Sequence, residues 1–350
     1  MSTPNTAAKS TYRFGASPNR LLQMDVLYFL VTLLFFYVQL HMVIQFAWLG
    51  HITLLALFLN LLCFKLGELA HELFDGGPAP LWIVLAAGSA ILSATMPDLS
   101  VLYFVFGLAM MKIRVELSAY SARSVKLSSR ALGFILAPLF HPVVFEIFVV
   151  ATFALCLLHI KHIKTNEAPR LHWFTLPENK RVYWTMGVHH AHYFIYCYSI
   201  PISFAAWSDL PMWSMGLVFY VGWAAYNAYE KWLRPSWPAF IIGHFIGALS
   251  LIGLYYAEAL SPLLFWWFMT GLGGGTVFML HRLVPRPADV VDRELSITEG
   301  FGHVFGVAVW GLLIFTVSPE SPYLAGAILA ALSMFIAYNA SKSKNGQPAS

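Results

Sequence analysis

The chain has 350 residues, of which 59% are hydrophobic and only 11% are charged, and its formal net charge is +4. Its mean hydropathy is +0.67. This composition excludes a soluble enzyme and predicts an all-α polytopic membrane protein that contacts the lipid bilayer along most of its length. The basic residues are spread over short connecting loops, so we expect no nucleic-acid partner.

Hydrophobic stretches of about 20 residues, long enough to cross about 30 Å of hydrocarbon as an α-helix, follow one another through most of the chain. Residues 131–160 are harder to interpret, because they are too long for one ordinary span and too short for two, and Pro138 and Pro142 interrupt them. The predicted full-length membrane helices are 25–47, 51–70, 80–97, 99–117, 182–205, 211–230, 236–256, 262–281, 300–318 and 322–340.

The distribution of lysine and arginine predicts the orientation of these helices. Basic residues gather before the first span, at 121–130, at 161–181 and in every second connection after that, whereas the alternate connections carry only acidic residues such as Asp98 and Asp209. Because Lys and Arg accumulate in short cytoplasmic loops, both termini are expected on the cytoplasmic side of an inner membrane.

With both flanking basic loops inside, residues 131–160 must cross the membrane an even number of times, as two short tilted helices or as a hairpin that enters and returns. The alternative is one long helix around a proline kink, which would export one of the two basic loops. We therefore predict about twelve membrane segments, two of them abbreviated. The predicted organisation is a cytoplasmic tail at 1–24, an N-terminal transmembrane half at 25–160, a basic cytoplasmic linker at 161–181, a C-terminal transmembrane half at 182–340 and a cytoplasmic tail at 341–350.

Three stretches carry a resemblance to a known family. "GWAAYNAYEKWLRPSWPAFIIGHFIGAL" resembles the tight cytoplasmic loop between the eighth and ninth helices of major facilitator superfamily (MFS) transporters, with Arg234 and Pro235 matching its end. "GELAHELFDGGPAPLWIVL" occupies the corresponding place in the first half, where Gly67 matches and His71 stands at a position that is usually Asp in the family. "FMTGLGGGTVFMLHRLV" is similar to the glycine-rich tenth helix. The resemblance implies a divergent, short transporter built from two halves of six helices.

The glycines of that last stretch predict a specific local structure. Gly271, Gly273, Gly274 and Gly275 lack side chains, so they allow neighbouring membrane helices to approach closely, and they weaken helical regularity.

The stretch "VHHAHYF" places His189, His190 and His192 about 10–15 Å into the bilayer, close to its midplane. On a helix, His189 and His192 share a face with Tyr193 one turn on, whereas His190 points about 100° away. Polar groups at this depth are costly in lipid, so they are expected to face a bundle interior or a water-filled cavity.

We predict that these residues belong to a central transport cavity. A histidine, His189 or His192, would take up and release a proton, and Glu146 is the candidate membrane carboxylate. The predicted function is secondary active transport of a small polar, aromatic or metal-chelating organic molecule, without a cofactor. The predicted substrate-binding residues are Gln39, His41, His141, His189, His192, Tyr193, Tyr220 and His244.

Three alternatives stay open beside transport. The first is a membrane iron hydroxylase or desaturase, and the second is a haem-bearing electron-transfer subunit with His189 and His244 as axial ligands. A metal ion, if one binds, would be held by His189, His192 and His244. In the third alternative each histidine only bonds a carbonyl or hydroxyl group between helices. The sequence names no membrane partner subunit.

Overall fold

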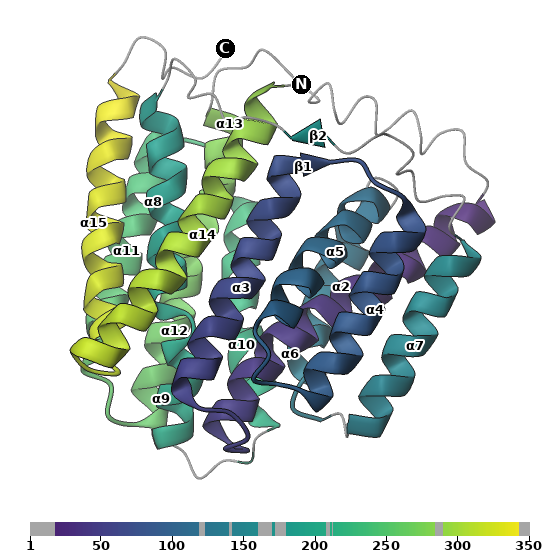
Figure 1. The fold of residues 1–350 in the computed structure, drawn as a ribbon. Helices are drawn as coiled ribbons and strands as arrows, with labels where there is room; N and C mark the ends of the chain where they lie inside the picture. The colour runs from purple at the N-terminus through teal and green to yellow at the C-terminus, as the bar shows by residue number, and fades with distance from the viewer. Residues whose placement is uncertain are drawn as a thin grey trace. The chain divides into compact units, whose positions relative to one another are not determined.

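The structure is a computed structural model, and it describes residues 18–118, 123–139, 142–159, 170–171, 180–207, 211, 213–283 and 290–342. The chain divides into two compact units, Met1–Trp173 and Phe174–Ser350. Each unit is a bundle of α-helices (Figure 1). The boundary between the units falls within 161–181, the segment that the sequence predicts as the linker between two halves.

The described helices of the first unit pack mostly against helices that are not their neighbours in sequence. Helix α2 packs against α6 and α7, α3 against α5, and α4 against α5 and α7. A short antiparallel strand pair, β1 (Phe74–Asp75) with β2 (Arg170–Leu171), accompanies them. The helices are α2 (Pro18–Ala47), α3 (Leu54–Leu73), α4 (Ala79–Thr95), α5 (Val101–Ser118), α6 (Arg123–Leu136) and α7 (Pro142–Leu158).

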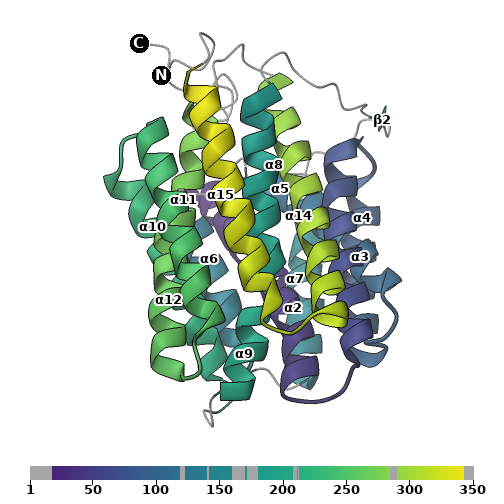
Figure 2. The same cartoon turned by 90° about the vertical axis from the view of Figure 1, so that its left-hand side faces the viewer.

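In the second unit, α8 lies between α14 and α15 (Figures 1 and 2), while α11 packs against α12 and α15, and α10 packs against α12. The helices are α8 (Lys180–Tyr196), α9 (Ser199–Trp207), α10 (Ser214–Trp232), α11 (Trp237–Tyr255), α12 (Leu260–Gly274), the 3-10 helix η2 (Gly275–Met279), α13 (Leu280–Leu283), α14 (Val290–Thr316) and α15 (Ser321–Ser341).

Local sequence signals set where several helices begin. The Thr53 side chain caps α3 by accepting a hydrogen bond from the Ala56 amide at 3.1 Å, and Ser236 caps α11 by accepting one from the Ala239 amide at 3.3 Å. Proline in the first turn of α11 strengthens that start, because its missing N–H has no partner there in any helix.

The glycine-rich stretch behaves as the sequence predicts. Helix α12 ends at Gly274, and the chain continues as the 3-10 helix η2. A Cβ atom on Gly271 would collide with the carbonyl oxygen of Gly222 in α10, and one on Gly273 would collide with that of Gly243 in α11. Both the close packing and the loss of regular α-helix are therefore confirmed.

Two predicted spans differ most from the structure. The predicted single span at 182–205 breaks at Cys197–Tyr198 into α8 and α9, and Pro201 lies in the first turn of α9, where a missing N–H is tolerated. The predicted span at 300–318 begins ten residues earlier as α14, at Val290. Its polar first turns extend beyond the apolar stretch by which spans are recognised.

The difficult stretch at 131–160 does divide into two helices, α6 and α7, but α6 already begins at Arg123. Most of the predicted basic loop at 121–130 is thus helical. Apolar and polar residues recur in α6 with the period of an α-helix, so α6 is amphipathic. Its basic residues therefore belong to a regular helix and not to a loop.

Five helices in the described part of the chain are long and apolar enough to cross a membrane. They are Leu22–Ala47, Leu54–Leu73, Trp237–Tyr255, Arg293–Thr316 and Ser321–Ser341. Two shorter apolar helices, Ala79–Thr95 and Val143–Leu158, accompany them. These helices support a multi-pass membrane protein, while the total of twelve segments stays a prediction.

Candidate functional site

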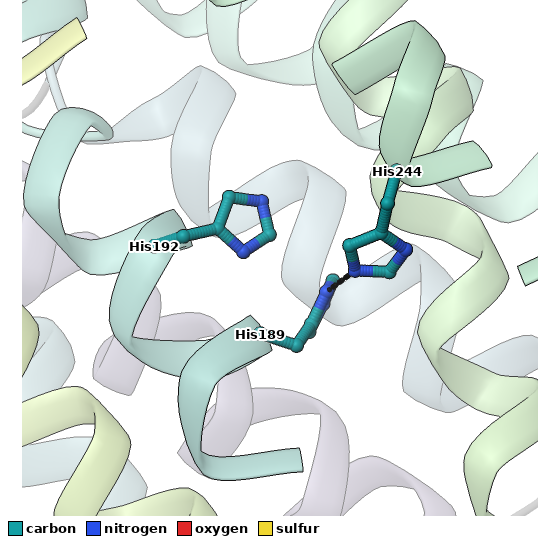
Figure 3. Close-up of side chains that lie close together, drawn as sticks. All are labelled: His189, His192 and His244. Atoms are coloured by element: carbon teal, nitrogen blue, oxygen red, sulfur yellow. Dashed lines mark hydrogen bonds between the residues drawn. The ribbon is translucent and has the colours of Figure 1, made fainter. Parts of the chain in front are cut away.

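Three histidines meet in the interior of the second unit (Figure 3). His189 and His192 come from α8 and His244 comes from α11, and their side chains are buried. One ring nitrogen from each lies within 4.8 Å of the others. We call these residues the trihistidine cluster.

Hydrogen bonds define the orientation of two of these rings. His244 Nδ1 lies 2.9 Å from the carbonyl oxygen of Phe240, which can only accept, so Nδ1 carries the hydrogen. A neutral His244 then presents an unprotonated Nε2, which lies 2.5 Å from His189 Nδ1. His189 must therefore donate this short hydrogen bond (Figure 3).

The third ring, that of His192, has an unsatisfied polar atom. Its Nδ1 is buried and has no hydrogen-bond partner among the described residues. The ring centroid lies 4.8 Å from that of His189 and 5.5 Å from that of His244. A buried polar atom without a partner costs free energy, so this nitrogen is a natural place for a proton or a ligand atom to bind.

Apolar packing seals the trihistidine cluster on one side. The Phe240 ring lies 4.0 Å from the His244 ring between centroids. Met186, one turn before His189, and Phe240 belong to a fully buried hydrophobic cluster. The surroundings are thus of low polarity, where hydrogen bonds and charges interact more strongly than in water.

A second polar cluster lies on the other side of α8. His303 Nε2 of α14 is 2.9 Å from His190 Nδ1, and Glu299 Oε1 is 3.5 Å from His190 Nε2 and 3.7 Å from His303 Nε2. We call His190, Glu299 and His303 the His–Glu–His cluster. Its side chains are partly exposed, 14% for each histidine and 31% for Glu299.

Sequence reasoning missed Glu299 and His303. Their spacing of four residues would have placed them on one helical face, but the predicted helix began at 300 and left Glu299 outside it. His190 does point away from the trihistidine face, as its position on the helix predicts.

Glycines bring α14 close enough to α8 to form the second cluster. A Cβ on Gly302 would lie 2.5 Å from the carbonyl oxygen of Gly187 and 2.9 Å from His190 Cβ. A Cβ on Gly306 would lie 2.5 Å from the carbonyl oxygen of Ala191. This small-xxx-small pattern allows the two backbones to approach, which places His303 beside His190.

The other predicted site residues of the second unit lie outside both clusters. Tyr193 is partly buried on α8, with its ring 5.7 Å from that of Tyr196. Tyr220 lies on α10 and is 40% exposed. Neither supplies a nitrogen or carboxylate oxygen to the clusters.

The remaining predicted residues belong to the first unit. Gln39 and His41 lie on α2, the partly exposed Glu146 lies on α7, and His141 is outside the described residues. The buried Nδ1 of His41 and Oε1 of Gln45 have no hydrogen-bond partner among the described residues. Both side chains line a small hollow together with Val38, Met42, Ser93, Ala94, Tyr103 and Phe145.

No protein-family model and no curated protein matches the sequence. Among solved structures, the chain is similar to the crystal structure of the human organic anion transporter MFSD10 (TETRAN), with a TM-score of 0.61. The match covers 92% of this chain and 100% of that chain. The chain has an MFS-like fold. The sequence identity is 13%, so the likeness confirms the fold that the sequence motifs suggested and carries no residue roles.

Proposed function

We propose that this chain is a secondary active transporter that moves a small polar, aromatic or metal-chelating organic molecule across the inner membrane. The MFS fold is the observation that carries the proposal, because MFSD10, which is similar over nearly the whole chain, is an organic anion transporter. We further propose twelve membrane segments with both termini in the cytoplasm, on the basis of the Lys and Arg distribution.

We assign energy coupling to protons that bind the trihistidine cluster. A proton added to the hydrogen-bonded pair of His189 and His244 would form an imidazolium bonded to a neutral imidazole, which is a charge-assisted hydrogen bond. The Nδ1 of His192, which has no hydrogen-bond partner in the part of the chain that the structure describes, offers a second acceptor nearby. Glu146, in the first unit, stays a candidate for a further proton carrier.

The proposal is tested with purified protein in liposomes, by measuring uptake of a mixed set of small organic anions and amines by mass spectrometry. We expect at least one solute to accumulate when a pH gradient is imposed, and no accumulation without it. His189→Ala and His192→Ala should abolish gradient-driven accumulation. His159→Ala is the matched control, because His159 follows directly after α7 in the first unit, outside the trihistidine cluster, and its Nδ1 lies 2.9 Å from the Leu155 carbonyl oxygen.

Cysteine labelling of the same variants checks that they insert, with residues near 125 and 290 inside and those near 98 and 258 outside. Equal accumulation by the wild type and both α8 variants would remove the coupling role of the trihistidine cluster. Absence of accumulation for every solute, under any gradient, would contradict the transport proposal itself.

The haem alternative meets a geometric obstacle. His189 Nδ1 and His244 Nε2 form a direct hydrogen bond of 2.5 Å, and a haem iron ligated from both sides would have to separate these rings. We therefore do not assign His189 and His244 as axial ligands of one haem.

A further inference from the structure

The His–Glu–His cluster combines ligand types that transition metals favour. Two imidazole nitrogens and one carboxylate oxygen form the ligand set of several zinc and non-haem iron sites. Here one such atom from each of His190, Glu299 and His303 lies within 4.8 Å of the others. All three residues are on two long helices, α8 and α14, which are more rigid supports than loops.

Two separations between ligand atoms match those around one ion. Bonds of about 2.1 Å place tetrahedral ligand atoms about 3.4 Å apart and neighbouring octahedral ones about 3.0 Å apart. Glu299 Oε1 lies 3.5 Å from His190 Nε2 and 3.7 Å from His303 Nε2. The 2.9 Å separation from His303 Nε2 is to the other ring nitrogen of His190, Nδ1. Because one imidazole gives one nitrogen to an ion, His190 would bind through Nε2, and one ligand atom from each of the three residues lies within 4.8 Å of the others.

The trihistidine cluster fits an ion less well. Its His189 Nδ1 and His244 Nε2 are 2.5 Å apart, closer than two ligand atoms on one ion, so these rings would have to separate. It also contains no carboxylate, so a divalent ion would bring two uncompensated charges into a sealed apolar interior. In the His–Glu–His cluster, by contrast, the carboxylate of Glu299 compensates one of the two charges of a divalent ion. The partial exposure of this cluster also allows an ion to enter.

We propose that His190, Glu299 and His303 bind a divalent first-row transition-metal ion of the Zn²⁺ or Fe²⁺ class. Three protein ligands leave coordination positions open for water or for oxygen and nitrogen atoms of a chelating solute. The ion replaces the hydrogen bond between His303 and His190. The close contact of Gly302 with α8 holds the ligands in place before the ion arrives.

Zn²⁺ is the probe for the test, applied to the full-length protein in detergent after treatment with a chelator. Competition with a fluorescent zinc indicator measures the affinity, and elemental analysis measures the stoichiometry. We expect one tightly bound Zn²⁺ per chain, and a loss of affinity of at least about 100-fold in both Glu299→Gln and His303→Ala, since losing even a residue that only hydrogen-bonds to a ligand costs about 10–100-fold. His244→Ala, which disrupts only the trihistidine cluster, should bind Zn²⁺ like the wild type.

Co²⁺ absorption spectra provide a second measurement, because the visible bands report the ligand set directly. The bands should change in Glu299→Gln, whose side chain keeps the shape of the wild-type residue, so a folding defect is separated from a ligand loss. Failure of the wild-type protein to bind Zn²⁺ would overturn the proposal. So would loss of binding in His244→Ala with retention in Glu299→Gln and His303→Ala, which would locate the ion in the trihistidine cluster. Neither measurement needs a gradient or a solute, so the result is independent of the transport proposal.

Discussion

The two units pack their helices by one scheme. The pairs α2–α6, α2–α7, α3–α5, α4–α5 and α4–α7 of the first unit correspond in chain order to α8–α14, α8–α15, α10–α12, α11–α12 and α11–α15 of the second. Glycines occupy matching contacts as well. A Cβ on Gly133 of α6 would lie 2.7 Å from the carbonyl oxygen of Leu33 in α2, as one on Gly302 of α14 would collide with α8. Such internal repeats are common in transporters.

The units differ in the polar groups that they bury within this scheme. In the first unit, α2 contributes His41, whose ring stacks on Tyr37 with centroids 5.2 Å apart. In the second, α8 contributes His189, His190 and His192, which contact histidines of two neighbouring helices. The same packing thus supports an aromatic stack in one unit and two polar clusters in the other. Packing alone does not decide where chemistry occurs.

The first unit contains a buried ion pair, and breaking that pair should cause the largest loss of stability. Lys65 Nζ lies 2.8 Å from Glu68 Oε1, and the Lys65 side chain is 3% exposed. Lys65→Met leaves the Glu68 carboxylate buried without the Lys65 ammonium group, so we expect a loss of about 3–5 kcal/mol in the free energy of unfolding. Denaturant titration in detergent measures it. The double variant Lys65→Met, Glu68→Leu should recover most of the loss, and an equally unstable double variant would argue against the pair.

Glycines make matching helix contacts within each unit, and the contact at Gly302 is tested next. Gly302→Ala should destabilise the protein by about 3 kcal/mol, because the new methyl group meets backbone on α8 that cannot move aside. It should also weaken Zn²⁺ binding, since it separates His303 from His190. Gly247→Ala is the matched control: among the described atoms, none outside the backbone of its own helix lies within 4 Å of a Cβ at this position, so the variant should be more stable by about 0.5–1 kcal/mol. Similar thermal stability of the two variants would refute the close approach.

The smallest expected change in stability comes from replacing one histidine in each unit. His244→Phe keeps an aromatic ring beside Phe240 but leaves the His189 donor without its acceptor, so we expect a loss of about 1–2 kcal/mol in unfolding free energy. His41→Phe keeps the stack on Tyr37 and removes a buried nitrogen that has no hydrogen-bond partner among the residues described, so stability should stay the same or rise. An equal loss in both variants would contradict the distinction between the two units.

Much of the candidate site could be predicted from local sequence patterns. The spacing of His189 and His192 on one helical face, and the direction of His190 about 100° away, depend only on the helical period. The glycine-rich break after α12 follows likewise from residue type. The predicted substrate-binding residues are divided between the two units: Gln39 and His41 lie in the first unit and His244 lies in the second.

Composition and periodicity by themselves determined that this chain is a helical membrane protein, where most of its helices run, and which histidines of α8 face the same way. These are local properties, since hydrophobicity and helical phase act over a few turns. Only the tertiary structure decided that His244 meets His189 across 55 residues and that His303 meets His190 across 113 residues. Those contacts depend on which helix packs against which, and backbone approach at Gly302 and Gly306, rather than any feature of the histidines themselves, brings α14 to α8.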